Sequence, residues 1–136
     1  MRKNTLKFKI IAGFIMVVAG YFFANTADFE DGFKPVNNIE KNNMKEKDYV
    51  DKYCKGTKEY VLPDKTRIDC VWDEYAIEYD WAQKWAESVG QSLYYAQMTG
   101  LKPAVAIIMK SPEDEKYIKR IQKADERIVV FKIKAY

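Results

Sequence analysis

Apolar and polar positions divide the chain into a leader, a polar segment and a single domain. Residues 10–23 form an apolar stretch that only two glycines interrupt, and residues 28–43 are polar and aperiodic, as is typical of a tether. From residue 44 onward, stretches with helical spacing follow stretches with strand-like alternation. We therefore expect residues 44–136 to form one domain, in keeping with their number.

The pattern of the domain predicts three helices and five strands. Alternating polar and apolar residues predict two strands, and apolar residues at three- and four-residue spacing predict a long helix that ends before Gly100. A continuous apolar run indicates a buried central strand. In chain order we expect a helix at 44–54, strands at 59–62, 67–72 and 75–80, a helix at 81–99, a strand at 104–109, a helix at 112–124 and a strand at 127–133. This order predicts an α/β fold that borders on α+β.

The leader is typical of an exported protein. Four basic residues and no acid lie before residue 10, and the 14 apolar residues that follow are fewer than the roughly 20 of a membrane-spanning helix. Small residues place a cleavage site after Ala24 or Ala27, and an uncleaved anchor is the alternative. We expect residues 1–27 to be a signal peptide or an N-terminal membrane anchor. The remainder would be periplasmic or secreted, or held at the inner membrane through this segment, its only expected membrane contact.

Charge and composition exclude several classes of function. The leader holds four of the 23 basic residues and no acid, so the remaining 109 residues carry 19 basic and 20 acidic side chains. These residues contain no basic tract that would support binding to nucleic acid. The absence of histidine excludes Ser-His-Asp catalysis, Cys-His catalysis and histidine zinc sites. Any chemistry must therefore come from carboxylates, lysine, tyrosine, hydroxyls or a hard metal ion.

Export changes the interpretation of the two cysteines. In an oxidising compartment, Cys54 and Cys70 can form a disulfide that closes a 16-residue loop, worth roughly 3 kcal/mol. Two free, buried thiols are the alternative. An even number of cysteines in a small exported domain favours the disulfide.

Acidic side chains gather on the predicted central strands. Glu78 and Asp80 point to the same face because strand side chains alternate, and Asp69 is within reach of Glu78 if their two strands pair. Carboxylates this close are costly unless they share a proton or a cation. Oxygen ligands of this kind suit Mg²⁺, whereas ordinary solvated strand acids are the alternative interpretation.

The long helix that follows places polar side chains at helical spacing. The set at i, i+4, i+7 and i+11 is Lys84, Ser88, Gln91 and Tyr95. We expect this face to lie opposite most of the apolar stripe and to border the acidic cluster. Lysine there can orient water or neutralise developing charge, and glutamine can hold a phosphate. A solvated helix face is the alternative. For Trp85 and Tyr94 we expect core packing.

Together these features resemble the PD-(D/E)XK nuclease superfamily. The resemblance rests on the element order, an acid on the second strand, Glu-X-charged on the third, and glutamine with tyrosine on the next helix. More narrowly, the chain resembles small exported bacterial proteins over about residues 54–110. The motifs are LPDKTRIDC at 62–70, AIEYD at 76–80, KWAE at 84–87 and GQSLYY at 90–95. The resemblance implies a restriction-endonuclease-like core, a mixed sheet flanked by helices.

The resemblance also implies a role for each matching residue. Asp69 and Glu78 would bind the metal, and Glu59 would match an additional upstream acid. Asp80 stands where the family usually has lysine. Lys84, on the next helix, is the natural substitute for that missing lysine. The implied catalytic set is Asp69, Glu78, Asp80, Lys84, Gln91 and Tyr95. The implied activity is hydrolysis of phosphodiesters in nucleic acid with Mg²⁺ or Mn²⁺.

Two other functions compete with an exported nuclease. The acid at position 80 and the lack of a basic tract favour a nuclease-like fold that has lost catalysis and serves as a binding module of the cell envelope. The third interpretation is an unrelated, small, disulfide-stapled envelope protein whose acids lie on its surface.

Overall fold

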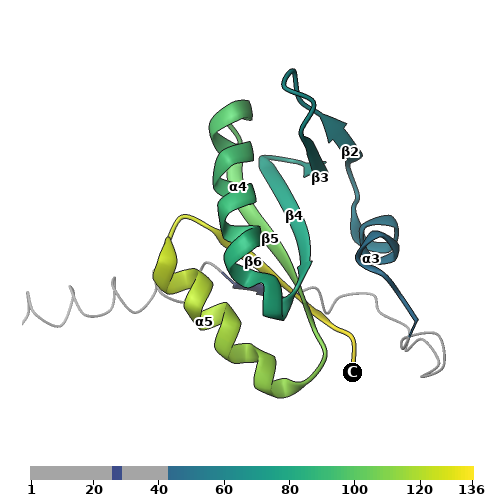
Figure 1. Ribbon diagram of the computed structural model, residues 1–136, viewed down its shortest axis with the longest axis vertical. Helices are drawn as coiled ribbons and strands as arrows, with labels where there is room; N and C mark the ends of the chain where they lie inside the picture. Colours follow the sequence, from purple (N-terminus) through teal and green to yellow (C-terminus); the bar gives the residue numbers. More distant parts are fainter. Residues whose placement is uncertain (1–25, 29–42) are drawn as a thin grey trace, which may run out of the picture.

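The computed structural model describes residues 26–28 and 43–136, and it has an α/β fold (Figure 1). Three helices and the five strands of a mixed sheet follow one another along the chain in the order α-β-β-β-α-β-α-β. The helices are α3 (Glu46–Tyr53), α4 (Trp85–Thr99) and α5 (Glu115–Ala124), and the strands are β2 (Thr57–Val61), β3 (Arg67–Trp72), β4 (Tyr75–Trp81), β5 (Lys102–Met109) and β6 (Val129–Lys134). Two short 3₁₀ turns, η1 (Ala82–Lys84) and η2 (Pro112–Asp114), lead into α4 and α5. The element order predicted from the sequence is confirmed.

Strand directions make the sheet mixed. The strands lie in the order β6-β5-β4-β3-β2; β2, β3 and β4 are antiparallel neighbours, whereas β4, β5 and β6 run parallel. A sixth strand that the sequence did not predict, β1 (Thr26–Asp28), pairs in parallel with β6. Cleavage after Ala27 would cut this strand, whereas cleavage after Ala24 would leave it whole. The rest of the leader and residues 29–42 of the tether lie outside the described residues.

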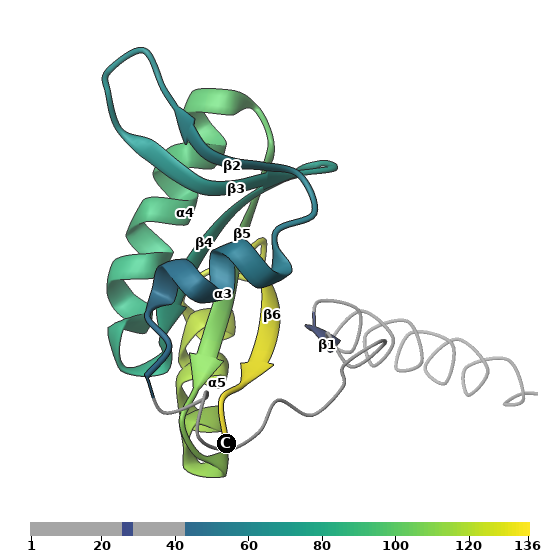
Figure 2. The same cartoon turned by 90° about the vertical axis from the view of Figure 1, so that its right-hand side faces the viewer.

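The helices cover both faces of the sheet. In Figures 1 and 2, α4 and α5 lie on one face and α3 lies on the other. On the α3 side, Tyr49 and Val50 pack with Ile77 and Tyr79 of β4. On the other side, Ile118 of α5 packs against alternate residues of β5. Within residues 43–136, no helix is both long enough and apolar enough to cross a bilayer.

Strand β5 lies inside the sheet, as its apolar run predicted. Every residue from 104 to 109 is buried. Alternate side chains of this strand enter the two cores on opposite faces of the sheet. A strand with both faces covered has no polar face, which explains the continuous apolar sequence.

The β2–β3 hairpin departs from regular strand geometry at two facing residues. Glu59 has a φ of 53°, which a residue with a side chain rarely adopts within a strand. Strict alternation would place Ile68 and Cys70 on one face of the sheet. Instead, Cys70 packs on the α3 side, and Ile68 packs with Tyr95 of α4 on the other side. The strand therefore changes orientation at Asp69, between these two residues.

Helix α4 ends at Thr99 as predicted, but it begins at Trp85 and not at residue 81, and its buried face differs from the predicted one. The sequence predicted that Ser88 and Tyr95 would lie on a polar face opposite the core, and this was wrong: both are buried. Ser88 is accommodated because its hydroxyl donates a hydrogen bond to the Trp85 carbonyl at 2.9 Å. Tyr94, which was expected in the core, is instead 41% exposed. Its hydroxyl donates a hydrogen bond to the carboxylate of Asp64.

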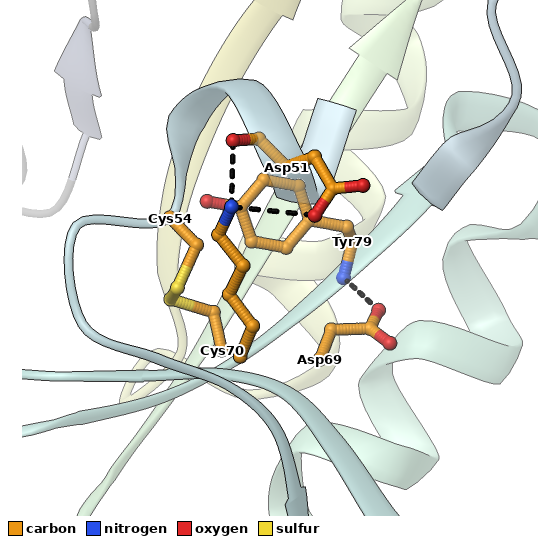
Figure 3. Close-up of a disulfide and its surroundings, with 6 residues drawn as sticks. Asp51, Cys54, Asp69, Cys70 and Tyr79 are labelled. Carbon is orange, nitrogen blue, oxygen red and sulfur yellow. Dashed lines mark hydrogen bonds and ion pairs between the residues drawn. A yellow bond between two sulfur atoms is a disulfide. The ribbon is translucent and has the colours of Figure 1, made fainter. Parts of the chain in front are cut away.

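The predicted disulfide is confirmed, and it joins α3 to the sheet (Figure 3). Cys54 follows the last residue of α3 and Cys70 lies on β3, with their Cα atoms 5.8 Å apart. A second link is close by, because Lys58 donates a hydrogen bond to the Asp51 carbonyl at 2.8 Å. Together these contacts hold α3 against the base of the β2–β3 hairpin.

Removing the disulfide should destabilise the fold. Cys54→Ser changes only the half-buried cysteine, so the buried Cys70 remains a thiol and introduces no new polar group. Because the 16-residue loop is no longer closed in the unfolded chain, we expect the free energy of unfolding to fall by roughly 3 kcal/mol. Urea denaturation measures this, and wild-type protein in a reductant should show the same loss. Equal stability of the oxidised wild type and the variant would contradict the prediction.

Candidate functional site

The candidate site lies where β3 separates from β4. Paired residues on the two strands run from Trp72–Tyr75 to Cys70–Ile77 and end there. Beyond this pair, the backbone N–H of Tyr79 donates a hydrogen bond to the side-chain carboxylate of Asp69 at 2.9 Å (Figure 3). A side-chain oxygen thus satisfies an N–H group at the point where regular pairing ends. This bond holds the Asp69 carboxylate beside the last third of β4.

Glu78 is one of two buried acids on β4. Its side chain lies on the α4 face of β4, the residue is 7% exposed, and its Oε2 atom has no hydrogen-bond partner in the described structure. Burial is the main cause that raises the pKa of Glu78 to about 9, and the charges of the neighbouring Asp69 and Asp80 carboxylates contribute to this rise. Glu78 is therefore protonated at neutral pH in the absence of a cation.

Asp80 belongs to a second group of charges at the end of β4. Burial raises the pKa of the Asp80 carboxyl, and so does its hydrogen bond with Glu46 of α3, since two carboxyl groups in such a bond share a proton. Lys84 joins both acids, with its Nζ atom 3.1 Å from Glu46 Oε1 and 3.4 Å from Asp80 Oδ1. The predicted lysine is thus next to Asp80, one of the predicted acids.

Asp69 is flanked by acids on the side of the hairpin. Burial raises its pKa, as do the charges of Glu59 and Glu46, whereas the Tyr79 N–H opposes the rise. Glu59 faces Asp69 across the hairpin but forms an ion pair with Arg67, at 2.6 Å between Oε2 and Nε. Glu59 therefore already has a cationic partner, although its charge acts on Asp69.

Gln91 and Tyr95 border the same cluster from α4. Tyr95 is 6% exposed, and its side chain forms a hydrogen bond with Gln91. Burial is the main cause that raises the pKa of Tyr95, and Glu78 and Asp69 add to it. The expectation that this part of α4 borders the acids was therefore right, although the face is buried and not solvated.

Sequence reasoning missed Glu46. It lies in the first turn of α3, a position where an acid is commonly explained by the helix dipole. Its contacts with Asp80 and Lys84 cross 34 and 38 residues of sequence, and no local pattern signals them. The signal in the sequence was an acid in the first turn of the predicted helix.

Asp69 and Glu78 are the residues of this arrangement that could hold a divalent cation. No three acidic side chains among the described residues come together as a ready-made cation site. Mg²⁺, however, commonly binds through one or two protein carboxylates and keeps several water ligands. Asp69 and Glu78 supply two such groups, and the unpartnered Oε2 of Glu78 is an oxygen that a cation would satisfy.

Comparison of the chain with protein-family models, with curated proteins and with solved structures found no match.

The protonation of Glu78 should make stability depend on pH. Without cations, the folded state keeps this proton up to about pH 9, whereas an exposed glutamate loses it near pH 4.5. Between these values the folded state binds more protons, so the free energy of unfolding falls as pH rises, by up to about 1.4 kcal/mol per pH unit.

Glu78→Gln should remove most of this dependence between pH 7.5 and 9 and should be more stable than the wild type at pH 9. Urea denaturation in EDTA at several pH values measures both quantities. Glu113→Gln, a change at an exposed acid at the start of η2, is the matched control and should retain the slope of the wild type. Equal slopes in the wild type and Glu78→Gln would contradict the assignment.

Proposed function

We propose that this protein is an exported phosphodiesterase that hydrolyses nucleic acid with Mg²⁺ or Mn²⁺ held by Asp69 and Glu78. The observation that carries the proposal is the Glu78 carboxyl, buried beside two other carboxylates with one oxygen unpartnered. Such a group is costly unless it is protonated or meets a cation. The α-β-β-β-α-β-α-β order supports the nuclease-like core, and the disulfide supports export.

When bound, a divalent ion would activate water and stabilise the charge on the leaving oxygen. The chain itself supplies the positions of its ligands. The Tyr79 N–H fixes one Asp69 oxygen, and Glu78 would have to lose its proton to serve as a ligand. Lys84 lies at the exposed rim, with its side chain 50% accessible, where its charge can meet a phosphate. Gln91 and Tyr95 border the acids from further along α4.

A nuclease-like binding module is the second candidate. The observation that favours it is the closed set of contacts among Lys84, Glu46 and Asp80, which uses the lysine charge within the protein. In that case the cluster would be a structural feature, and the protein would bind its partner without cleaving it.

Cleavage assays distinguish the two. Full-length protein in a mild detergent, with the disulfide formed, is incubated with labelled single-stranded DNA, double-stranded DNA and RNA in Mg²⁺, Mn²⁺ or EDTA. We expect cleavage that requires the metal, and a loss of roughly 100-fold or more in Asp69→Asn and Glu78→Gln, since each removes a metal ligand. Glu113→Gln should cleave like the wild type. No cleavage of any substrate, or equal rates in both variants and the wild type, would overturn the proposal.

Lys84 should affect the rate of cleavage and not the affinity for the metal ion. We expect Lys84→Ala to slow cleavage by roughly 10- to 100-fold, because a positive charge beside the phosphate is lost. Mn²⁺ binding, measured by calorimetry, should not weaken, since removing a cation near the acids favours another cation. Lys84→Arg keeps the charge and should recover part of the rate. Weaker Mn²⁺ binding in Lys84→Ala would contradict this role.

A further inference from the structure

A cleft opens at the carboxyl ends of the three parallel strands. It is bordered by Trp81 at the end of β4, Lys110 just after β5 and Ala135 just after β6. Its volume is about 750 Å³, which is in the range of sites that hold a small organic ligand, roughly 300–1,000 Å³. In open α/β sheets, ligands bind outside the carboxyl ends of the strands. The position and the size of this cleft therefore suit a ligand.

The walls of the cleft combine positive charge with apolar surface. Among the described residues that line it, three are lysines and one is an acid: Lys45, Lys84, Lys110 and Glu46. Their formal charge is +2 in a domain that is nearly neutral. The other described residues that line it are Met44, Trp81 and Ala135. This combination suits a ligand with a doubly negative group and a flat apolar part.

Lys110 is held in place for such a contact. Its Nζ atom lies 4.4 Å from the centroid of the Trp81 ring, and that ring packs edge-on against Tyr49 at 5.6 Å. The Lys110 backbone N–H donates a hydrogen bond to Asp114 at 2.8 Å. None of the ion pairs found among the described residues involves Lys110, so its charge is not neutralised within that part of the protein.

The cleft is continuous with the candidate site. Lys84 and Glu46 line it, and both contact the Asp80 side chain at the end of β4. One end of a ligand in the cleft would therefore lie beside Glu46 and Asp80. A phosphate monoester carries close to two negative charges at neutral pH, which matches the charge of the lining, whereas a phosphodiester carries one.

We propose that this cleft binds the terminal nucleotide of a nucleic-acid strand that ends in a phosphate monoester. Lys110 and Lys45 receive the terminal phosphate, the nucleoside lies against Met44 and Ala135, and the next phosphodiester points toward Lys84 and the acids. The inference rests on the proposed function for its substrate class. It adds that the protein recognises strand ends by their phosphate.

Binding without cleavage tests this proposal. Full-length protein in detergent and EDTA is titrated into ten-nucleotide single strands of DNA that carry a 5′-phosphate, a 3′-phosphate or neither, each with fluorescein at the opposite end. Fluorescence anisotropy gives the dissociation constants. We expect one phosphorylated strand to bind at least ten-fold more tightly than the strand without phosphate, and inorganic phosphate to compete for that difference.

Matched variants locate the effect. Lys110→Gln should abolish the preference for the phosphorylated strand, and Lys110→Arg should retain part of it. Lys119→Gln, an exposed lysine on α5, should retain all of it. Equal binding of all three strands, or equal loss in Lys119→Gln and Lys110→Gln, would overturn the proposal.

The outcome is separable from that of the proposed function. Because EDTA removes metal, Glu78→Gln should keep the phosphate preference even though it cannot cleave. A preference without cleavage in Mg²⁺ would support the cleft and overturn the nuclease proposal. Cleavage in Mg²⁺ without a preference for the phosphorylated strand would support the nuclease proposal and overturn the proposal for the cleft.

Discussion

The hydrogen bond from the Tyr79 N–H to the Asp69 carboxylate is the contact on which the site depends. It replaces a backbone partner at the point where β3 leaves β4, and so keeps the edge of β4 satisfied while the two strands separate. Because β3 and β4 separate, the β2–β3 hairpin can pack toward Tyr95. The edge of β4 then becomes accessible to Glu46. A regular ladder would have placed a backbone carbonyl where the carboxylate is.

This geometry concentrates carboxyl groups in a largely buried region. Glu78 has its pKa raised to about 9 and retains its proton, whereas the equally buried Asp80 forms a hydrogen bond with Glu46 and contacts Lys84. Proteins place strained charge of this kind at functional sites more often than elsewhere. The same arrangement makes the fold sensitive to pH and links its stability to any cation that replaces the proton.

The sequence predicted the elements of the domain far better than their irregularities. Alternation placed β3 at residues 67–72, where it is observed, because its pairing is regular at both ends. It did not predict the change of orientation at Asp69, since a period of two assumes an unbroken strand. Helical spacing grouped Tyr95 with Lys84 and placed both on a face away from the core, which was wrong for Tyr95 because this part of the helix packs against the sheet. Glu46 was missed because its contacts are made through the fold alone.

The protonation state of Glu78 is the central claim, and NMR measures it directly. Glutamate labelled with ¹³C at the side-chain carboxyl carbon is incorporated, the Glu78 signal is assigned by its absence in Glu78→Gln, and its chemical shift is followed against pH. We expect a midpoint near pH 9 in EDTA and a midpoint below pH 7 in saturating Mg²⁺. A midpoint near pH 4.5 in EDTA, or one that Mg²⁺ does not move, would contradict the account.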